Sequence, residues 1–400
     1  MNQGAFKKLR EEFPVLRKYA YLNTAAYGLL PLRAIKRLQE AVVKFCSEGP
    51  VDSNLENKVL LEARNEISKL INCKPEEIAF TTSTTTGLKV ALRMIRLKPG
   101  DNVVSFDLEF PGLAATVKSL CDRVGCRVNI VKHRNGFYEL SDIRRAVNEK
   151  TKAIVASSVQ WVNGLKMDLK ALREIADSVG AYLILDSIQH VGGILFDVNE
   201  AKPDFVAVGG EKWLMATWMG VGFLYVRKQL VNEFELPPYG LLNLREPKGG
   251  WSSYWSRLRK NPWKLLPARK TAEKYEWGGT PPVFSLLAFY GSLKMLNEIG
   301  MGNVHERNIR LKEYLVEKLF EIGAKIISFK ENKEEWSSIT TFRLHKSLER
   351  DRLLVERLRG RGIIVSTRGV SGIGGIRVSP HFYNDVADID RLLCEISRVL

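Results

Sequence analysis

Cysteine, acidic residues and long apolar runs are scarce in this chain of 400 residues, and each scarcity excludes something. The five cysteines form no CxxC pair, which argues against a disulfide framework, a zinc ribbon and a thiol redox motif. The start, Met1 to Lys8, lacks the apolar core of a signal peptide, and the longest largely apolar stretch, Phe284–Leu296, is shorter than the ~18 residues of a membrane span. We therefore predict a soluble, cytoplasmic protein without a metal site.

The deficit of acidic residues leaves a strong positive charge. There are 61 lysines and arginines against 45 aspartates and glutamates, for a net charge of +16 and a pI of about 9.5. Nucleic acid, an anionic membrane and acidic metabolites all remain possible partners, because net charge argues about solubility and steering rather than function. A hydrophobic content of 45% excludes a disordered chain, and the length suits two domains of roughly 100–200 residues each.

Short apolar runs rich in β-branched residues alternate with segments of helical period between residues 78 and 227. Runs that are apolar at consecutive positions are typical of strands covered on both faces, and helical crossovers between them favour a mostly parallel sheet. We therefore predict an α/β fold whose large domain has three layers (αβα). The predicted strands are Ile78–Thr81, Asn102–Phe106, Ala153–Ser157, Tyr182–Asp186, Phe205–Val208 and Gly222–Val226; the predicted helices include Thr86–Ile95, Leu113–Val124, Leu140–Asn148 and Leu169–Ser178.

The pattern changes after residue 283 and predicts a smaller α+β C-terminal domain. Gly278–Pro282 interrupts regular structure, so we place the large domain at 20–283 and the small domain at 1–19 together with 284–400. The predicted small-domain helices are 284–299, 305–322, 348–359 and one starting at Asp385, and the predicted strands are Lys325–Phe329, Ser338–Arg343, Ile363–Ser366 and Gly375–Ser379.

Residues 237–282 combine proline, glycine and tryptophan with many basic residues. Tryptophans interleaved with cations can stack on a single-stranded nucleic acid and neutralise it. The simpler interpretation is a solvated insertion whose tryptophans pack inward or at a subunit contact. The residues concerned are Trp251, Trp255 and Trp263 with Arg257, Arg259, Lys260, Lys264, Arg269 and Lys270.

Two polar residues follow neighbouring predicted strands. Lys212 comes after a strand and a Gly-Gly step, which places it at the carboxyl end of the sheet, where open α/β sheets bind ligands. It is either a catalytic amine or a contact to phosphate or a buried acid. Asp186 closes an apolar strand and needs a cationic partner, which is an arginine, a helix N-terminus or the protonated nitrogen of a ring. Gln189, three residues later, can bind another atom of such a ring.

Three further segments carry chemistry-bearing residues. The run Ser83-Thr84-Thr85-Thr86 at a strand-to-helix turn is either a simple N-cap or a phosphate cup. Phe110, in Glu109-Phe-Pro, can cover a planar ring, although it and Trp161 also fit an ordinary core. Arg377 lies in an apolar strand, and the carboxylate that it needs belongs either to this chain or to a substrate.

Together these features resemble the fold-type I pyridoxal-phosphate (PLP) enzymes, specifically the class V aminotransferase group of cysteine desulfurases, kynureninases and isopenicillin N epimerase-like proteins. The resemblance extends from Tyr21-Leu-Asn-Thr-Ala-Ala to Arg377-Val-Ser-Pro-His-Phe-Tyr-Asn. It implies a homodimer with shared active sites and the cofactor PLP. The resemblance implies that Lys212 holds the cofactor as a Schiff base, while Asp186 pairs with the pyridine nitrogen, Gln189 reaches the phenolic oxygen and Phe110 stacks on the ring. It implies a phosphate cup of Ser83, Thr84 and Thr85, completed by Thr280 of the partner subunit, and further cofactor contacts from Gln160 and Trp251. Arg377 and Asn23 are the residues that it assigns to substrate binding.

Departures from the family pattern narrow the reaction. Cysteine desulfurases carry a nucleophilic cysteine shortly before the carboxylate-binding arginine, whereas residues 366–377 contain none. Glu211 stands before the lysine, where these relatives often have histidine or tyrosine. The last motif is most similar to the epimerase-like branch, so we expect amino transfer or epimerisation at the Cα of an amino acid. A PLP-dependent lyase of the kynureninase or C–S type is the alternative within enzymes, and a basic nucleic-acid-binding protein is the alternative outside them.

Overall fold

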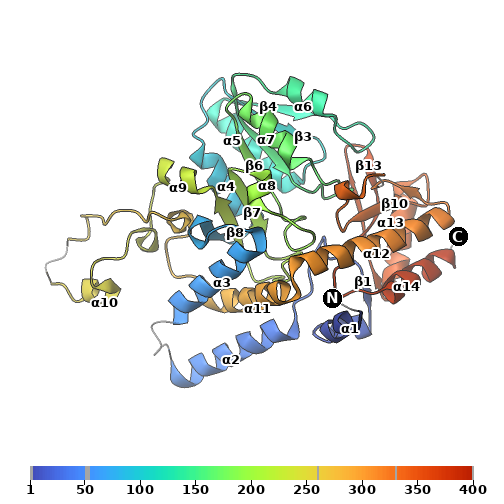
Figure 1. Cartoon of the computed structure of the whole chain (residues 1–400), viewed down its shortest axis with the longest axis horizontal. Helices are drawn as coiled ribbons and strands as arrows, with labels where there is room; N and C mark the ends of the chain where they lie inside the picture. Colours follow the sequence, from blue (N-terminus) through green and yellow to red (C-terminus); the bar gives the residue numbers. More distant parts are fainter. Residues whose placement is uncertain (1–2, 50–54, 259–260, 329–330, 399–400) are drawn as a thin grey trace.

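The large domain has the predicted three layers, a mostly parallel sheet covered by helices on both faces, and the sheet has seven strands where the sequence predicted six (Figure 1). The computed structural model describes residues 3–49, 55–258, 261–328 and 331–398. The strand order is β2-β8-β7-β6-β5-β3-β4, and β8 runs in the opposite direction to the other six strands. The strands are β2 (Ile78–Thr81), β3 (Asn102–Phe106), β4 (Arg127–Val131), β5 (Thr151–Ser157), β6 (Tyr182–Asp186), β7 (Phe205–Gly209) and β8 (Gly222–Val226).

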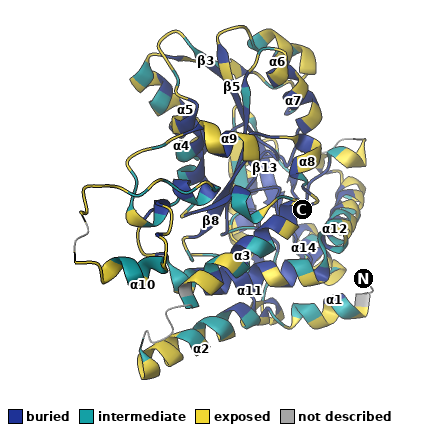
Figure 2. Ribbon diagram, turned by 60° about the vertical axis from the view of Figure 1, so that its left-hand side comes forward, coloured by how far each residue is buried: buried dark blue, intermediate teal, exposed yellow. Residues whose placement is uncertain are grey.

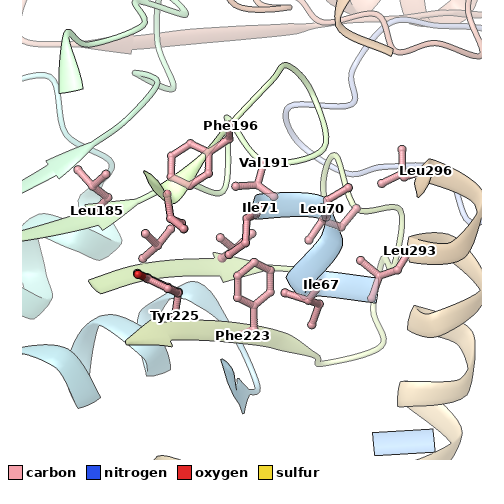
Figure 3. Packing of buried hydrophobic residues seen from close by; sticks show 14 of the residues in the cluster. Ile67, Leu70, Ile71, Leu185, Val191, Phe196, Phe223, Tyr225, Leu293 and Leu296 are labelled. Atoms are coloured by element: carbon pink, nitrogen blue, oxygen red, sulfur yellow. The ribbon is translucent and has the colours of Figure 1, made fainter. Parts of the chain in front are cut away.

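Consecutive apolar residues of one strand pack into different cores, which explains why these runs do not alternate with polar residues. In β6, Leu183 and Leu185 belong to one apolar cluster, and Ile184 belongs to the cluster on the opposite face. Figure 3 shows the first cluster, where side chains of α3 (Leu55–Ile71) and α11 (Val283–Ile299) meet those of β6 and β8. The second cluster lies under α4 (Thr84–Met94) and α5 (Pro111–Val124). Figure 2 shows the buried strands between more exposed helices.

Strand β4 was missing from the sequence prediction. It lies at the edge of the sheet, paired only with β3 among the described strands, and most of its side chains are at least partly exposed. Its sequence Arg-Val-Asn-Ile-Val therefore lacks the continuous apolar character of the central strands. The remaining helices of this domain are α2 (Leu32–Glu48), α6 (Leu140–Ala146), α7 (Leu169–Asp177), α8 (Val198–Ala201) and α9 (Lys228–Glu233).

The small domain joins both ends of the chain. Its sheet has the order β12-β13-β10-β9, and β1 (Ala20–Tyr21) pairs in parallel with β11 (Ile363–Ile364). Phe13 packs against Phe382 and Tyr383, with ring centroids 6.0 and 4.6 Å away. The other elements are α1 (Gln3–Arg10), α12 (Met301–Glu321), α13 (Leu348–Gly360), α14 (Val386–Ser397), β9 (Lys325–Ile326), β10 (Thr340–Arg343), β12 (Ser366–Val370) and β13 (Ile373–Val378). Phe329, the predicted end of one strand, lies outside the described residues.

Helix α11 stands at the predicted domain boundary. It packs on α2 and α3, and its buried residues share the apolar cluster of the large sheet. A Cβ at Gly291 would lie 2.9 Å from the Cα of Ala34, so a glycine is needed where α11 approaches α2 so closely. The division into 20–283 and 1–19 with 284–400 stays a prediction.

Residues 235–282, which we call the arm, leave the body of the large domain and return to it. Helix α10 (Gly250–Trp255) lies at its far end (Figure 1). Trp251 stacks on Trp255, and Trp263 is 91% exposed; Arg259 and Lys260 lie outside the described residues. The arm returns at the mostly buried Glu276, which accepts hydrogen bonds from Arg64 (2.5 Å) and from the backbone N–H of Phe80 (2.8 Å). Across the described ranges, no helix is both long enough and apolar enough to cross a bilayer.

Candidate active site

Lys212 and Asp186 lie at the carboxyl edge of the large sheet, where β6 and β7 end side by side. Asp186 is the last residue of β6, and Lys212 follows the last residue of β7 by three positions. The lysine loop is held from the other side by Gly28, whose N–H donates to the Glu211 carbonyl (2.8 Å). A Cβ at residue 28 would lie 1.9 Å from the Lys212 carbonyl oxygen, so only glycine fits there. The structure thus places both predicted residues at one site.

The amine of Lys212 is made less basic by its surroundings. Burial, assisted by the cations Arg377 and Arg368, lowers the pKa of Lys212 to about 8, against the opposing effect of Asp186 and Glu211. No carboxylate among the described residues forms an ion pair with Lys212, and its Nζ lies 5.5 Å from the centroid of the Phe110 ring. Near neutral pH a useful fraction of the lysine is therefore an uncharged nucleophile.

Asp186 is buried without a guanidinium partner. Burial raises the pKa of Asp186 to about 6, although the N–H of Ile188 (3.1 Å) and the nearby Lys212 favour the charged form. An arginine of this chain was one of the predicted partners, and none pairs with Asp186 in the described ranges. A cation arriving with a ligand would therefore find a carboxylate ready to stabilise it.

Gln189 is oriented by two protein contacts. Its Nε2 donates to the Ala25 carbonyl (3.0 Å), and its Oε1 accepts from the indole N–H of Trp213 (2.9 Å). One hydrogen of the amide nitrogen remains for the phenolic oxygen that the sequence resemblance assigns to it. The indole also fixes which end of the amide carries the nitrogen.

The predicted phosphate cup is the first turn of α4. Ser83 is the N-cap, and its Oγ accepts the N–H of Thr86 (3.2 Å). Thr84 Oγ1 accepts the N–H of Gly209 (2.8 Å), which ties the helix start to the end of β7. A Cβ at Gly87 would lie 3.0 Å from the Cβ of Ala207, so glycine allows this close approach. The turn supplies hydroxyls and first-turn N–H groups to an anion.

Phe110 caps the start of α5, and 43% of it is exposed. Its ring meets that of Trp161 edge to face at 5.5 Å. The neighbouring Glu109 is buried and accepts hydrogen bonds from the Ser157 N–H (2.8 Å) and from Gln160 Nε2 (3.0 Å). Burial raises the pKa of Glu109 to about 7. The amide nitrogen of Gln160 is therefore bound to protein, while its buried Oε1 has no partner within the described part of the chain.

Arg377 is buried in β13 and has no carboxylate partner among the residues that the structure describes. Its Nη1 donates to the Trp161 carbonyl (2.8 Å), and its Nε has no acceptor. Burial and the nearby Arg368 lower the pKa of Arg377 to about 9. The Oδ1 of Asn23 is also buried and unpaired in the described ranges. Two partners were predicted for Arg377, a carboxylate of this chain or one of a substrate. Among the described residues no carboxylate of this chain pairs with it.

Arg368 was not predicted from the sequence. It lies in β12, and the register pairs Ser366 with Arg377, so residues 366, 368 and 377 share one face of the hairpin. The hairpin closes with a two-residue turn at Ser371 and Gly372, whose φ values are 48° and 81°. The sequence feature that could have identified Arg368 is a basic residue two positions after the start of a strand that turns back at Ser371-Gly372.

The same hairpin contains residues 366–377, where the sequence resemblance leads one to look for the nucleophilic cysteine of a desulfurase. Its tip contacts the large domain, because Ser371 Oγ donates to the Asp107 carbonyl (2.8 Å) and the Ser371 carbonyl lies 2.9 Å from His133 Nε2. The five cysteines lie elsewhere: Cys46, Cys73, Cys121, Cys126 and Cys394. The hairpin therefore places no thiol beside Lys212.

Trp251 and Thr280 lie on the arm. Trp251 has its ring contacts with Tyr254 and Trp255, and Thr280 is exposed. Within the described residues neither is recorded in contact with Lys212, Asp186 or α4. A role for either at the cofactor requires a second subunit and stays a prediction.

The residues present fit PLP. A cationic ring nitrogen matches the unpaired buried Asp186, a phosphate matches the first turn of α4, and an aldehyde matches the weakly basic amine of Lys212. The partly exposed face of Phe110 is left for a planar ring. An amino-acid carboxylate matches Arg377, whose Nε has no acceptor among the described residues.

Comparisons with known proteins point the same way. The model of the family Aminotransferase class-V matches residues 20–392. A probable cysteine desulfurase of Ureaplasma parvum serovar 3 is 27% identical, over 94% of this chain and 93% of the relative. The uncharacterized aminotransferase YcbU of Bacillus subtilis (strain 168) is 24% identical, over 98% and 97%.

Solved structures share the fold over nearly the whole chain. The apo cysteine desulfurase of Thermococcus onnurineus NA1 superposes with a TM-score of 0.84 at 21% identity, covering 98% of this chain and 97% of that one. The cystine C–S lyase C-DES, in complex with its reaction product cysteine persulfide, gives 0.84 at 18% identity, covering 96% and 99%. At such identities the likeness shows the fold alone.

Proposed function

Because the chain belongs to the class V aminotransferase family of PLP-dependent enzymes, we propose that it is a C–S lyase that eliminates sulfur from the β-carbon of a sulfur-containing amino acid. The observation that carries the proposal is the β12–β13 hairpin, which contains Arg377 and, on the same face, Arg368, but no cysteine. A desulfurase needs a protein thiol to receive the sulfur. In an elimination the sulfur instead leaves the substrate directly, as part of a thiol or persulfide.

This proposal replaces the expectation drawn from the last sequence motif. Amino transfer and epimerisation have less support, because several relatives of similar length are named cysteine desulfurases and one structural neighbour is named a cystine C–S lyase. Amino transfer remains the second candidate, since another relative is named an aminotransferase. Membership of the family favours an enzyme of amino acids over a nucleic-acid-binding protein.

In this reaction the cofactor supplies an electron sink for the pair released from Cα. Arg377 binds the α-carboxylate, with the amide N–H₂ of Asn23 rather than its buried Oδ1 as a second donor, and so presents Cα to Lys212. The neutral Nζ of Lys212 takes the Cα proton and returns a proton to the sulfur as the Cβ–S bond breaks. Asp186 keeps the ring nitrogen charged. The products are a thiol or persulfide, a 2-keto acid and ammonia after addition of water, with no net oxidation.

The proposal includes a homodimer in a reducing compartment such as the cytoplasm. Thr280 and Trp255 of α10 are both exposed, which would let the arm reach a second subunit. Five cysteines without a disulfide among them suit a reducing compartment. Sedimentation of the holoprotein would show whether it is a dimer.

The decisive experiment identifies the product made from L-cystine and L-cysteine by the purified holoenzyme. We expect pyruvate, ammonia and a low-molecular-weight persulfide or sulfide in equal amounts. A variant that lacks all five cysteines should keep this turnover, and Lys212→Ala should lose it. Alanine as the product, or a persulfide on the protein, would instead identify a desulfurase. A keto acid that retains sulfur would identify amino transfer.

A further inference from the structure

Trp161 contacts two parts of the site that lie far apart in the sequence: the turn that carries Phe110 and the guanidinium of Arg377. From the sequence it fits an ordinary core aromatic, but in the structure it is only partly buried and belongs to the irregular segment that follows β5. This segment runs past the carboxyl edge of the sheet, where Asp186 and Lys212 also lie. The indole side chain and the backbone carbonyl of Trp161 have different partners.

The indole of Trp161 is fixed to the turn that carries Phe110. Its Nε1 donates to the Leu108 carbonyl at 3.0 Å, and its ring meets the edge of Phe110 at 5.5 Å. Leu108 is itself held from the other side, because its N–H donates to the hydroxyl of Tyr138 at 2.9 Å. The indole therefore docks on a turn whose position is already determined.

The carbonyl of Trp161 is the acceptor recorded for the guanidinium of Arg377. Arg377 Nη1 donates to this oxygen at 2.8 Å, while its Nε has no partner in the described ranges. The neighbouring Val162 carbonyl accepts from Thr341 Oγ1 at 2.7 Å, so the segment joins the small-domain sheet at two adjacent positions. Arg377 and Thr341 are paired residues of β13 and β10.

We propose that Trp161 is a positioning residue for the substrate α-carboxylate, acting through Arg377. The indole fixes the segment against the Phe110 turn, and the fixed carbonyl then sets the direction of the buried guanidinium. A guanidinium that binds a carboxylate through two parallel hydrogen bonds depends strongly on its direction. The inference rests on the proposed function only in requiring an amino acid as ligand, not in the fate of its sulfur.

A role in packing alone makes a different prediction. Loss of packing at the site would weaken every amine that enters it, with or without a carboxylate. Loss of guanidinium direction would weaken carboxylate-bearing ligands selectively. L-alanine and ethylamine differ by the α-carboxylate, so the ratio of their dissociation constants measures the contribution of Arg377.

The test compares the binding of these two ligands to holoenzyme variants by titration of the visible absorbance of the cofactor. For Trp161→Ala we expect the preference for L-alanine over ethylamine to fall by about tenfold or more, the size of one lost charge-assisted hydrogen bond. Trp161→Phe keeps the ring beside Phe110 but loses the N–H, and should fall by a smaller factor. Trp336→Phe, which removes the indole N–H of a buried tryptophan in the small domain, is the matched control and should leave the ratio unchanged.

A double mutant tests whether Trp161 acts through Arg377 or independently of it. Because Trp161 acts through Arg377, adding Trp161→Ala to Arg377→Met should change the ratio no further. Equal weakening of both ligands, or independent effects of the two substitutions, would overturn the proposal. If Trp161→Ala does not fold, the comparison of Trp161→Phe with Trp336→Phe decides, and an unchanged ratio in both would refute it. Failure of the lyase assignment would appear in the products and leave these ratios untouched.

Discussion

Replacing Arg377 by methionine should stabilise the fold while removing much of the activity. Arg377 is 1% exposed and has no carboxylate partner among the described residues, so its charge is held in the folded state at a cost. Methionine has a similar length, carries no charge and adapts to irregular cavities. The substitution therefore separates the contribution of the side chain to substrate binding from its effect on the free energy of unfolding.

The size of the effect follows from the pKa of Arg377, which burial and the nearby Arg368 lower from the ordinary value of an arginine to about 9. At about 1.36 kcal/mol per unit, the buried charge costs on the order of 5 kcal/mol. The cost is complete below the folded pKa of about 9 and disappears as the pH rises toward the ordinary pKa of an arginine. The variant leaves the Trp161 carbonyl without its donor, at roughly 1–3 kcal/mol, so the net gain in unfolding free energy is about 2–4 kcal/mol. Two lost charge-assisted hydrogen bonds to substrate should lower kcat/KM by about 10²- to 10⁴-fold.

Urea denaturation of the two apoproteins at one protein concentration and neutral pH measures the first effect, because cofactor and subunit association would otherwise add to stability. Steady-state kinetics of the holoenzymes measures the second. An Arg377→Met apoprotein that unfolds at lower urea than the parent would show that the guanidinium has a partner in solution, and the argument from its unpaired burial would then be wrong.

Other substitutions test the remaining parts of the site and of the fold. Cofactor capture by the apoprotein should accelerate as the pH rises through about 8, the pKa of Lys212, because the neutral amine reacts; a rate independent of pH would contradict the assigned amine. Asp186→Asn should retain the cofactor but lose about 10³-fold or more in kcat, since an amide cannot keep the ring nitrogen charged, and near-normal turnover would exclude the pairing. Glu276→Ala should cost about 3–5 kcal/mol of unfolding free energy, because Arg64 and the N–H of Phe80 lose their buried acceptor, whereas Glu276→Gln should cost less, as denaturation curves will show.

The central strands were predictable because their physical constraint is local. Residues such as those of β6 are buried on both faces, so the sequence itself is apolar without interruption. The order of these strands, with a polar residue at each carboxyl end, also predicted that Asp186 and Lys212 would meet. Strand β4 escaped prediction because most of its side chains are at least partly exposed, whereas β2, at the opposite edge of the sheet, is buried throughout and was predicted.

The unpaired state of the buried charges could not be read from the sequence. Whether Arg377 meets a carboxylate of this chain depends on contacts between β13 and segments more than two hundred residues away, such as Trp161. The same holds for Gln160, whose amide nitrogen is bound to Glu109. Local patterns predict what a side chain needs, and the tertiary structure decides whether the chain or a ligand supplies it.

The pairing of β1 with β11 has a consequence for synthesis. At roughly 5–20 residues per second, residues 20–21 wait about 20–70 s for residues 363–364 to leave the ribosome. During that interval Phe13 also lacks Phe382 and Tyr383, so an apolar segment at the front of the nascent chain stays uncovered. A transcript truncated before codon 382 would release a polypeptide with this segment permanently exposed, prone to aggregation and a substrate for chaperones.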